Sequence, residues 1–235
     1  RTCISVIKSG IKDILLEKPG GSDIKELKNI SSIASSHRSK VLIAYNRRFY
    51  SSIIKVNEII KNEGLISIHF DFTEIIKKIR KLKIEKKIKS KWVLGNSSHV
   101  IDTVFFLAGL PKNIKVRTSG GLDWHKSASV FVGNGITKNG ALFSYHANWN
   151  SPGRWGIYIM TKKSKITLQP LEEIKIQNFK SFEVKSYNLN DKYDHTFKPG
   201  IYRMVKSFIS ENSIHLPTID YHIKSTKVLY KIANY

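Results

Sequence analysis

Two side chains of this sequence stand where they could move a proton at a hydroxyl group. Lys18 follows a short apolar segment and precedes Pro19, which fixes the turn and removes a backbone donor. His99 stands in the first turn of a predicted helix, where the positive end of the helix dipole disfavours an imidazolium. An ammonium can stabilise a developing alkoxide, and a neutral imidazole can accept a proton. We therefore expect Lys18 to stabilise an alkoxide and His99 to act as general base, across one shared crevice.

Each of these side chains also has a purely structural interpretation. Lys18 could be one of many exposed lysines in a lysine-rich chain, and His99 could cap a helix or pack in the core. Asp102 lies three residues after His99, on the same face of the predicted helix. It could orient the imidazole or complement the helix N-terminus, and the sequence favours neither role.

The segments around Lys18 alternate as they do in α/β proteins. Four elements are predicted: a helix over 2–8, a strand over 13–17, a helix over 22–37 and a strand over 40–45. Continuous apolar strands separated by an amphipathic helix argue for a parallel sheet covered on both faces. Lys18 would then lie at the carboxyl end of a parallel strand, where open α/β sheets bind ligands.

From residue 49 onward the pattern changes to that of an α+β protein. Helices are predicted over 51–61, 96–109, 200–210 and 221–233. Strands are predicted over 66–74, 114–119, 127–133, 140–147, 155–161, 164–168, 173–178 and 182–187. Gly and Asn between the later strands are typical of antiparallel hairpins. The predicted fold class is a parallel α/β piece, residues 1–48, followed by an α+β domain on one large, mostly antiparallel open sheet, residues 49–235.

Composition limits the class of protein. A chain of 235 residues, 41% of them hydrophobic, can bury about 70% of its unfolded surface. No apolar run reaches the roughly 18 residues that a membrane span needs, so we expect a soluble protein without a membrane partner. The single cysteine, Cys3, excludes an internal disulfide and a cysteine-based zinc site. No set of histidines has metal-ligand spacing, so no metal site is predicted.

The positive charge leaves more than one interpretation open. Lys and Arg number 40 against 18 Asp and Glu, a formal net charge of +22. Such a charge attracts nucleic acid, anionic membranes and phosphorylated substrates, but lysines spread over the whole chain also fit compositional drift. The densest stretch, residues 77–91, could be a flap that grips substrate phosphates or a solvated loop. A nucleic-acid partner is the less favoured alternative.

Three motifs, in matching order and spacing, resemble those of one enzyme family. Leu16-Glu17-Lys18-Pro19 resembles the Glu-Lys-Pro motif of the Gfo/Idh/MocA family, the glucose–fructose oxidoreductase and inositol dehydrogenase-like enzymes. Tyr45-Asn46-Arg47-Arg48-Phe49 resembles the segment in which that family crosses between its domains. Ser98-His99-Val100-Ile101-Asp102 resembles its catalytic histidine motif. The resemblance extends over essentially the whole chain.

This resemblance implies a fold, an activity and a set of partners. Residues 1–48 would be the C-terminal part of a Rossmann-type dinucleotide-binding domain, with sequence missing upstream of Arg1. Residues 49–235 would bind substrate and form a homo-oligomer through the open sheet. The activity would be hydride transfer between NAD or NADP and a hydroxyl of a sugar, a nucleotide sugar or another sugar derivative. A cytoplasmic location is expected.

The same resemblance assigns residues to a binding site. Cofactor-binding residues would be Glu17, Lys18, Pro19 and Arg47. Substrate contacts near the motifs would be Tyr45, Asn46, Asn96 and Asp102.

Aromatic and polar side chains of the strand region could complete the sugar site, because sugars bind against aromatic faces with added hydrogen bonds. The best candidates are costly to bury without a partner: His125, Tyr145, Asn148 and Arg154. Tyr145 would share one strand face with Phe143. Ordinary sheet packing is the alternative for each ring.

Two departures from the family pattern keep other functions open. No G-x-G-x-x-G turn is present, since Gly133-Asn134-Gly135 is followed by Lys138 and falls in a predicted hairpin. Many family members carry an Asp four residues before the histidine, where this sequence has Gly95. The alternatives are a degenerate, non-catalytic member that serves oligomerisation or binding, and a basic nucleic-acid-binding protein.

Overall fold

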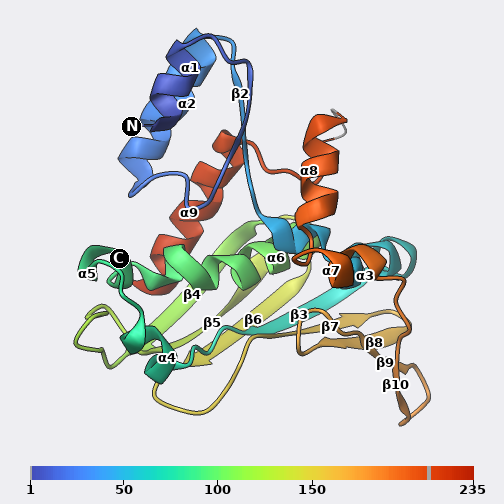
Figure 1. Ribbon diagram of the computed structural model, residues 1–235. Coiled ribbons are helices and arrows are strands. Elements are labelled where there is room, and N and C mark those ends of the chain that lie inside the picture. The colour runs from blue at the N-terminus through green and yellow to red at the C-terminus, as the bar shows by residue number, and fades with distance from the viewer. Residues whose placement is uncertain (1, 211–212) are drawn as a thin grey trace.

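The computed structural model describes residues 2–210 and 213–235. These residues form a two-stranded parallel sheet and an eight-stranded mixed sheet, with helices around both (Figure 1). The predicted fold class is therefore confirmed: a small parallel sheet stands beside a large, mostly antiparallel one. The division of the chain between residues 48 and 49 stays a prediction.

The small sheet belongs to an α/β unit at the start of the described chain. Its elements are α1 (Thr2–Lys8), β1 (Asp13–Leu16), α2 (Ile24–Ser36) and β2 (Lys40–Ile43). β1 and β2 pair in parallel, with Leu16 opposite Ile43, so their carboxyl ends lie side by side. Asp23 caps α2 by accepting a hydrogen bond from the Glu26 amide at 2.9 Å. The unit thus places the chain after β1 and the chain after β2 at one edge.

The large sheet has the strand order β10-β9-β8-β7-β3-β6-β5-β4. Its strands are β3 (Leu65–Asp71), β4 (Pro111–Ser119), β5 (Val130–Thr137), β6 (Leu142–Asn148), β7 (Gly156–Thr161), β8 (Ser164–Leu168), β9 (Lys175–Asn178) and β10 (Val184–Ser186). Consecutive strands from β4 to β6 and from β7 to β10 pair antiparallel, as the hairpin signals indicated. β3 is inserted between β6 and β7 and runs parallel to β6, which no local signal indicated.

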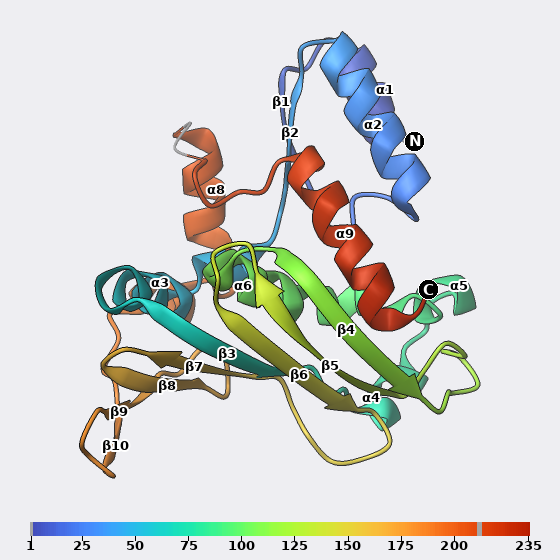
Figure 2. The ribbon, with the colours of Figure 1, turned by 180° about the vertical axis from the view of Figure 1, so that it is seen from behind.

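One face of this sheet carries the core and the other is open. Along β6, Phe143, Tyr145 and Ala147 are buried, while Leu142 and Ser144 are exposed. The helix α6 (Ser98–Ala108) packs on the buried face, and Figure 2 shows the sheet from its open side with α6 behind it. The alternation expected for this strand is confirmed, but it sends Tyr145 into the core.

The remaining helices connect the two sheets and flank the large one. They are η1 (Asn46–Phe49, a 3-10 turn), α3 (Ser51–Glu63), α4 (Ile76–Lys81), α5 (Lys86–Lys89), η2 (Val93–Ser97, a π-helical turn), α7 (Lys192–Thr196), α8 (Ile201–Ile209) and α9 (Ile219–Ala233). α9 packs along α2, and its Ile219 joins the core of the small sheet. None of the described helices is long and apolar enough to cross a membrane.

A buried ion pair joins the segment after β2 to α6. The Arg48 guanidinium donates two hydrogen bonds to the Asp102 carboxylate, at 2.7 and 2.6 Å, and both side chains are at least 95% buried. The rings of Phe106 and Tyr221 lie 4.9 and 5.1 Å from the guanidinium carbon. Asp102 is therefore committed to Arg48: the alternative that it orients the imidazole of His99 is not realised, and the expected substrate contact at Asp102 is wrong.

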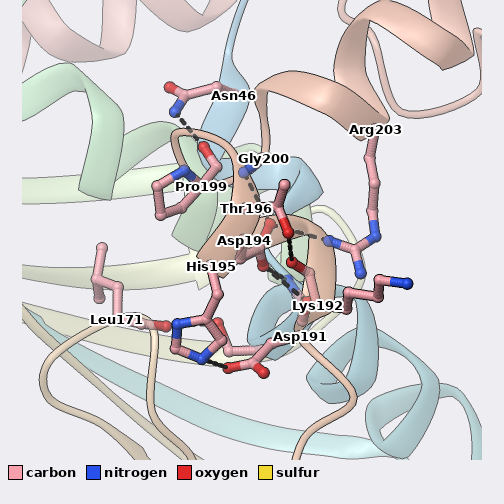
Figure 3. A network of polar contacts seen from close by, with 12 residues as sticks. Asn46, Leu171, Asp191, Lys192, Asp194, His195, Thr196, Pro199, Gly200 and Arg203 are labelled. Carbon is pink, nitrogen blue, oxygen red and sulfur yellow. Dashed lines mark hydrogen bonds and ion pairs between the residues drawn. The ribbon is translucent and has the colours of Figure 1, made fainter.

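A second polar network ties the same segment to the chain before α8 (Figure 3). Asn46 Nδ2 donates to the Pro199 carbonyl at 2.9 Å. Asp194 accepts hydrogen bonds from the backbone amides of Ser51 and Gly200, at 2.7 and 3.0 Å, and pairs with Arg203 at 2.9 Å. The amide of Asn46 is thereby occupied inside the fold, so the expectation that it contacts substrate is wrong.

The Arg48–Asp102 pair predicts a large effect of mutation on stability. Asp102→Ala leaves the Arg48 charge buried without a partner, which costs about 3–5 kcal/mol of unfolding free energy. Glu58→Ala is the control, because Glu58 pairs with Lys55 on the surface and its loss costs at most about 0.5 kcal/mol. Urea unfolding of both variants measures the difference, and equal small losses would contradict the role of the pair.

Candidate active site

Lys18 and His99 are brought together through the turn that precedes α6. Lys18 follows the carboxyl end of β1, and its Nζ donates a hydrogen bond to the Gly95 carbonyl. Gly95 lies in the π-helical turn η2, four residues before His99, which is about one helical turn. The amine and the imidazole therefore come from the two parts of the chain and meet at one place.

Burial, together with the neighbouring Arg47 guanidinium, lowers the pKa of the Lys18 amine to about 8. The carboxylates of Glu17 and Glu74 act in the opposite direction, since negative charge favours the ammonium. Lys18 is thus mainly a cation at neutral pH, but a substantial share of the amine is neutral near pH 8.

His99 is buried, with only 7% of its surface exposed, and its Nδ1 has no hydrogen-bond partner among residues 2–210 and 213–235. Burial lowers the pKa of the imidazole strongly, and the charges of Lys18 and Arg47 add to the effect. The imidazole is therefore neutral at pH 7, but not for the expected reason. η2 runs directly into α6, so His99 does not stand at a free helix start where a dipole would act.

A cavity of about 800 Å³ adjoins this pair. Lys18 and His99 do not line the cavity, but three of its lining residues, Asn96, Arg47 and Trp155, lie next to the pair. Asn96 follows Gly95, the guanidinium carbon of Arg47 lies 5.4 Å from the Trp155 ring centroid, and that ring lies 6.5 Å from the imidazole of His99. The cavity also exposes the charged side chains of Lys78, Arg154, Glu74 and Glu172.

Of the residues expected in the site, Arg47, Asn96 and Arg154 line the cavity. Glu17 and Pro19 flank Lys18 on the surface and lie outside the cavity lining. The Pro19 carbonyl accepts a hydrogen bond from His222 Nε2 at 2.8 Å.

Tyr45 packs beneath the pair instead of facing a ligand. Its side chain is 1% exposed, and its ring lies 5.9 Å from the His99 ring and 5.6 Å from the His222 ring. The expected substrate contact at Tyr45 is therefore wrong, because the ring supports His99 from inside the core.

The aromatic wall expected among the strands is a core cluster. His125 is fully buried, its Nδ1 donates to the Ala128 carbonyl at 2.7 Å, and its Nε2 accepts from the Tyr235 hydroxyl at 2.7 Å. Its ring lies 4.8 Å from the Trp149 ring. His125 and the 1%-exposed Tyr145 therefore contact no substrate, because both lie on the covered face of the sheet.

Asn148 and the glycine pair of β5 also have structural roles. Asn148 Oδ1 accepts the Asn150 amide at 3.0 Å, and Asn148 is absent from the cavity lining. A Cβ at Gly133 would lie 2.4 Å from the Tyr145 ring, so glycine is needed there for packing. Gly133 and Gly135 both lie within β5, a strand of the antiparallel pair β4–β5.

The site also contains a residue that the sequence analysis did not single out. Glu74 lies just beyond β3, is 8% exposed and lines the cavity. Its carboxylate accepts hydrogen bonds from Ser97 Oγ at 2.7 Å and from Asn96 Nδ2 at 3.0 Å. Burial raises the pKa of the carboxyl, and these hydrogen bonds oppose the shift. The sequence signal for Glu74 was an acidic residue at the end of a strand with apolar residues.

No family model and no curated protein matches the sequence, but solved structures match the fold. An oxidoreductase from Agrobacterium radiobacter, crystallised with NAD+, L-tartaric acid and magnesium, is 12% identical, with a TM-score of 0.75 over 99% of this chain and 74% of that one. An inositol dehydrogenase homologue from Azotobacter vinelandii, crystallised with NADH and myo-inositol, is 11% identical, with a TM-score of 0.75 over 99% and 71%.

A third similar structure is that of an enzyme named for a nucleotide sugar. It is the UDP-N-acetylglucosamine 3-dehydrogenase GnnA from Acidithiobacillus ferrooxidans, 13% identical, with a TM-score of 0.72 over 98% of this chain and 74% of that one. The chain therefore has the fold of Gfo/Idh/MocA-type oxidoreductases, as the three motifs predicted.

The charges around Lys18 predict a measurable pKa. The amine of Lys18 should be half-protonated near pH 8, and Arg47→Gln should raise this pKa because it removes a neighbouring positive charge. Lysine side-chain NMR, or competitive acetylation across a pH series, measures the value. Arg117→Gln, on the exposed strand β4, is the control and should leave it unchanged. A Lys18 pKa at the ordinary 10.5 would show that the amine is not buried beside Arg47.

Proposed function

We propose that this chain belongs to an oxidoreductase that transfers a hydride between NAD or NADP and a hydroxyl of a sugar or sugar derivative. The observation that carries the proposal is the Lys18 amine, held by the Gly95 carbonyl one turn before the neutral, buried imidazole of His99. The pair lies beside a cavity in a fold shared with proteins crystallised with NAD+ or NADH.

The residues present fit the nicotinamide end of a dinucleotide. Lys18 and Arg47 follow the carboxyl ends of two adjacent parallel strands, where open α/β sheets bind their ligands. The Nδ1 of His99 is fully buried and has no partner within the described chain, so a ligand group would reach this imidazole at its other nitrogen, Nε2. We assign Lys18, Arg47 and His99 to that end of the cofactor and to the reacting hydroxyl beside it. The bound cofactor would supply the hydride acceptor.

The pKa shifts support an exchange of the roles expected from the sequence. With a pKa of about 8, Lys18 is the stronger base, whereas a proton on His99 is opposed by burial and by the charges of Lys18, Arg47 and Lys198. The neutral Lys18 amine would accept the proton of the hydroxyl, and the Gly95 carbonyl would direct its lone pair by accepting one amine hydrogen. His99 Nε2 would orient the hydroxyl. In the opposite direction the Lys18 ammonium would return the proton to the alkoxide.

The cavity supports a polyol substrate with an anionic group. The indole of Trp155 offers an aromatic face, and Asn96 and Glu74 offer polar groups, which is the usual make-up of a sugar site. Lys78, from the basic helix α4, and Arg154 also line the cavity and would suit phosphates. A nucleotide sugar, the substrate class named for the similar GnnA, satisfies both features.

The proposed roles predict large losses of turnover. In the purified protein, Lys18→Met and His99→Ala should each lower kcat by at least about 100-fold, the usual contribution of a positioned proton-transfer group. Lys115→Ala, on the exposed edge strand β4, is the control and should stay near wild type. NADH formation with UDP-N-acetylglucosamine or myo-inositol is the assay. Unchanged turnover in both variants would refute the assignment, and failure to bind NADH would favour a non-catalytic role in binding or oligomerisation.

The protonation of Lys18 also predicts the pH dependence. For alcohol oxidation, kcat/KM should rise as pH increases through about 8, because the deprotonated amine is the acceptor. Arg47→Gln should move the rise to higher pH. A pH profile that falls over this range would contradict Lys18 as the proton acceptor.

A further inference from the structure

We propose that Glu74 is the carboxylate of this site: it faces Lys18 and Arg47 and accepts a hydrogen bond from a second hydroxyl of the substrate. The inference rests on the proposed function, since it concerns the same cavity. It adds a binding residue and a specificity, because a substrate would need a hydroxyl donor in reach of Glu74.

The hydrogen bonds of Glu74 hold it at the wall of the cavity with acceptor capacity left over. Among the hydrogen bonds of the described residues, Oε1 accepts from Ser97 Oγ and Asn96 Nδ2, and Oε2 accepts from Asn96 Nδ2 at 3.1 Å. The indole N–H groups of Trp92 and Trp155 also act on this carboxyl and lower its pKa. An ionised carboxylate has about four acceptor positions. Because Glu74 lines the cavity, the remaining capacity of Oε2 is available to a ligand.

The charges around the cavity give Glu74 a second role. Its carboxylate raises the pKa of both Lys18 and Arg47, so it compensates the two cations at the reacting end. Glu17 acts on the same two residues but is exposed to solvent, where its charge is screened. Glu74 is 8% exposed and therefore acts with little screening.

Gly95 explains why a carboxylate from another element is needed. A Cβ built on Gly95 meets no atom within 4 Å, so the turn that holds Lys18 contributes no side chain at this point. Glu74 follows the strand β3, and its carboxylate accepts hydrogen bonds from Asn96 and Ser97, the two residues after Gly95. The acid is therefore fixed to the same turn that accepts the Lys18 hydrogen bond.

The first experiment measures the Lys18 pKa without any substrate. Glu74→Gln keeps the shape and an acceptor oxygen but removes the charge, so the Lys18 pKa should fall below its wild-type value of about 8. Glu172→Gln is the matched control, because this second cavity carboxylate does not act on Lys18 and should leave the value in place. An unchanged Lys18 pKa in Glu74→Gln would overturn the inference even if the protein proves to be an oxidoreductase.

The second experiment tests the contact with substrate. With myo-inositol or UDP-N-acetylglucosamine, whichever is oxidised, Glu74→Gln should lower kcat/KM at least tenfold while the Kd for NADH changes less than twofold. Replacing the substrate by a deoxy analogue that lacks the contacted hydroxyl should lower kcat/KM far more for the wild-type enzyme than for Glu74→Gln. Wild-type kinetics in Glu74→Gln would overturn the inference and leave the proposed function standing. If neither compound is oxidised by wild type, the proposed function fails, and the Lys18 pKa still decides whether Glu74 faces the amine.

Discussion

The burial of one lysine amine against a backbone carbonyl is the constraint on which the site depends. Lys18 gives up much of its hydration beside Arg47, and the Gly95 carbonyl replaces part of what is lost. The amine is therefore both fixed in direction and easier to deprotonate. The same two cations, with burial, keep His99 neutral, so the pair combines a tuned base with an uncharged imidazole.

The fold holds this arrangement by polar ties that are themselves buried. Arg48 and Asp102 fix the segment after β2 to α6, and Asp194 fixes it to the chain before α8. Arg47 lies between Asn46, which bonds to the Pro199 carbonyl, and Arg48, so its backbone is held on both sides where its guanidinium reaches the cavity. Asp102, which was expected to contact substrate, instead helps to position the residues that line the cavity.

Local patterns in the sequence predicted most elements and the two chemical groups. The alternation in β6 and the apolar runs of β1 and β2 are local properties of the sequence, so these strands could be predicted from it. The insertion of β3 between β6 and β7, the partner of Asp102 and the burial of His125 depend on contacts between distant segments. An aromatic or charged side chain looks the same in sequence whether it faces a ligand or the core, which is why those expectations failed.

The location of a bound cofactor tests the central claim most directly. The measurement is a crystal structure of the protein, expressed from its complete gene, with NADH and a polyol. The nicotinamide ring should lie beside Lys18 and His99, with the polyol in the cavity lined by Arg47, Glu74 and Trp155. A nicotinamide bound elsewhere, or a polyol without contact to that cavity, would contradict the account.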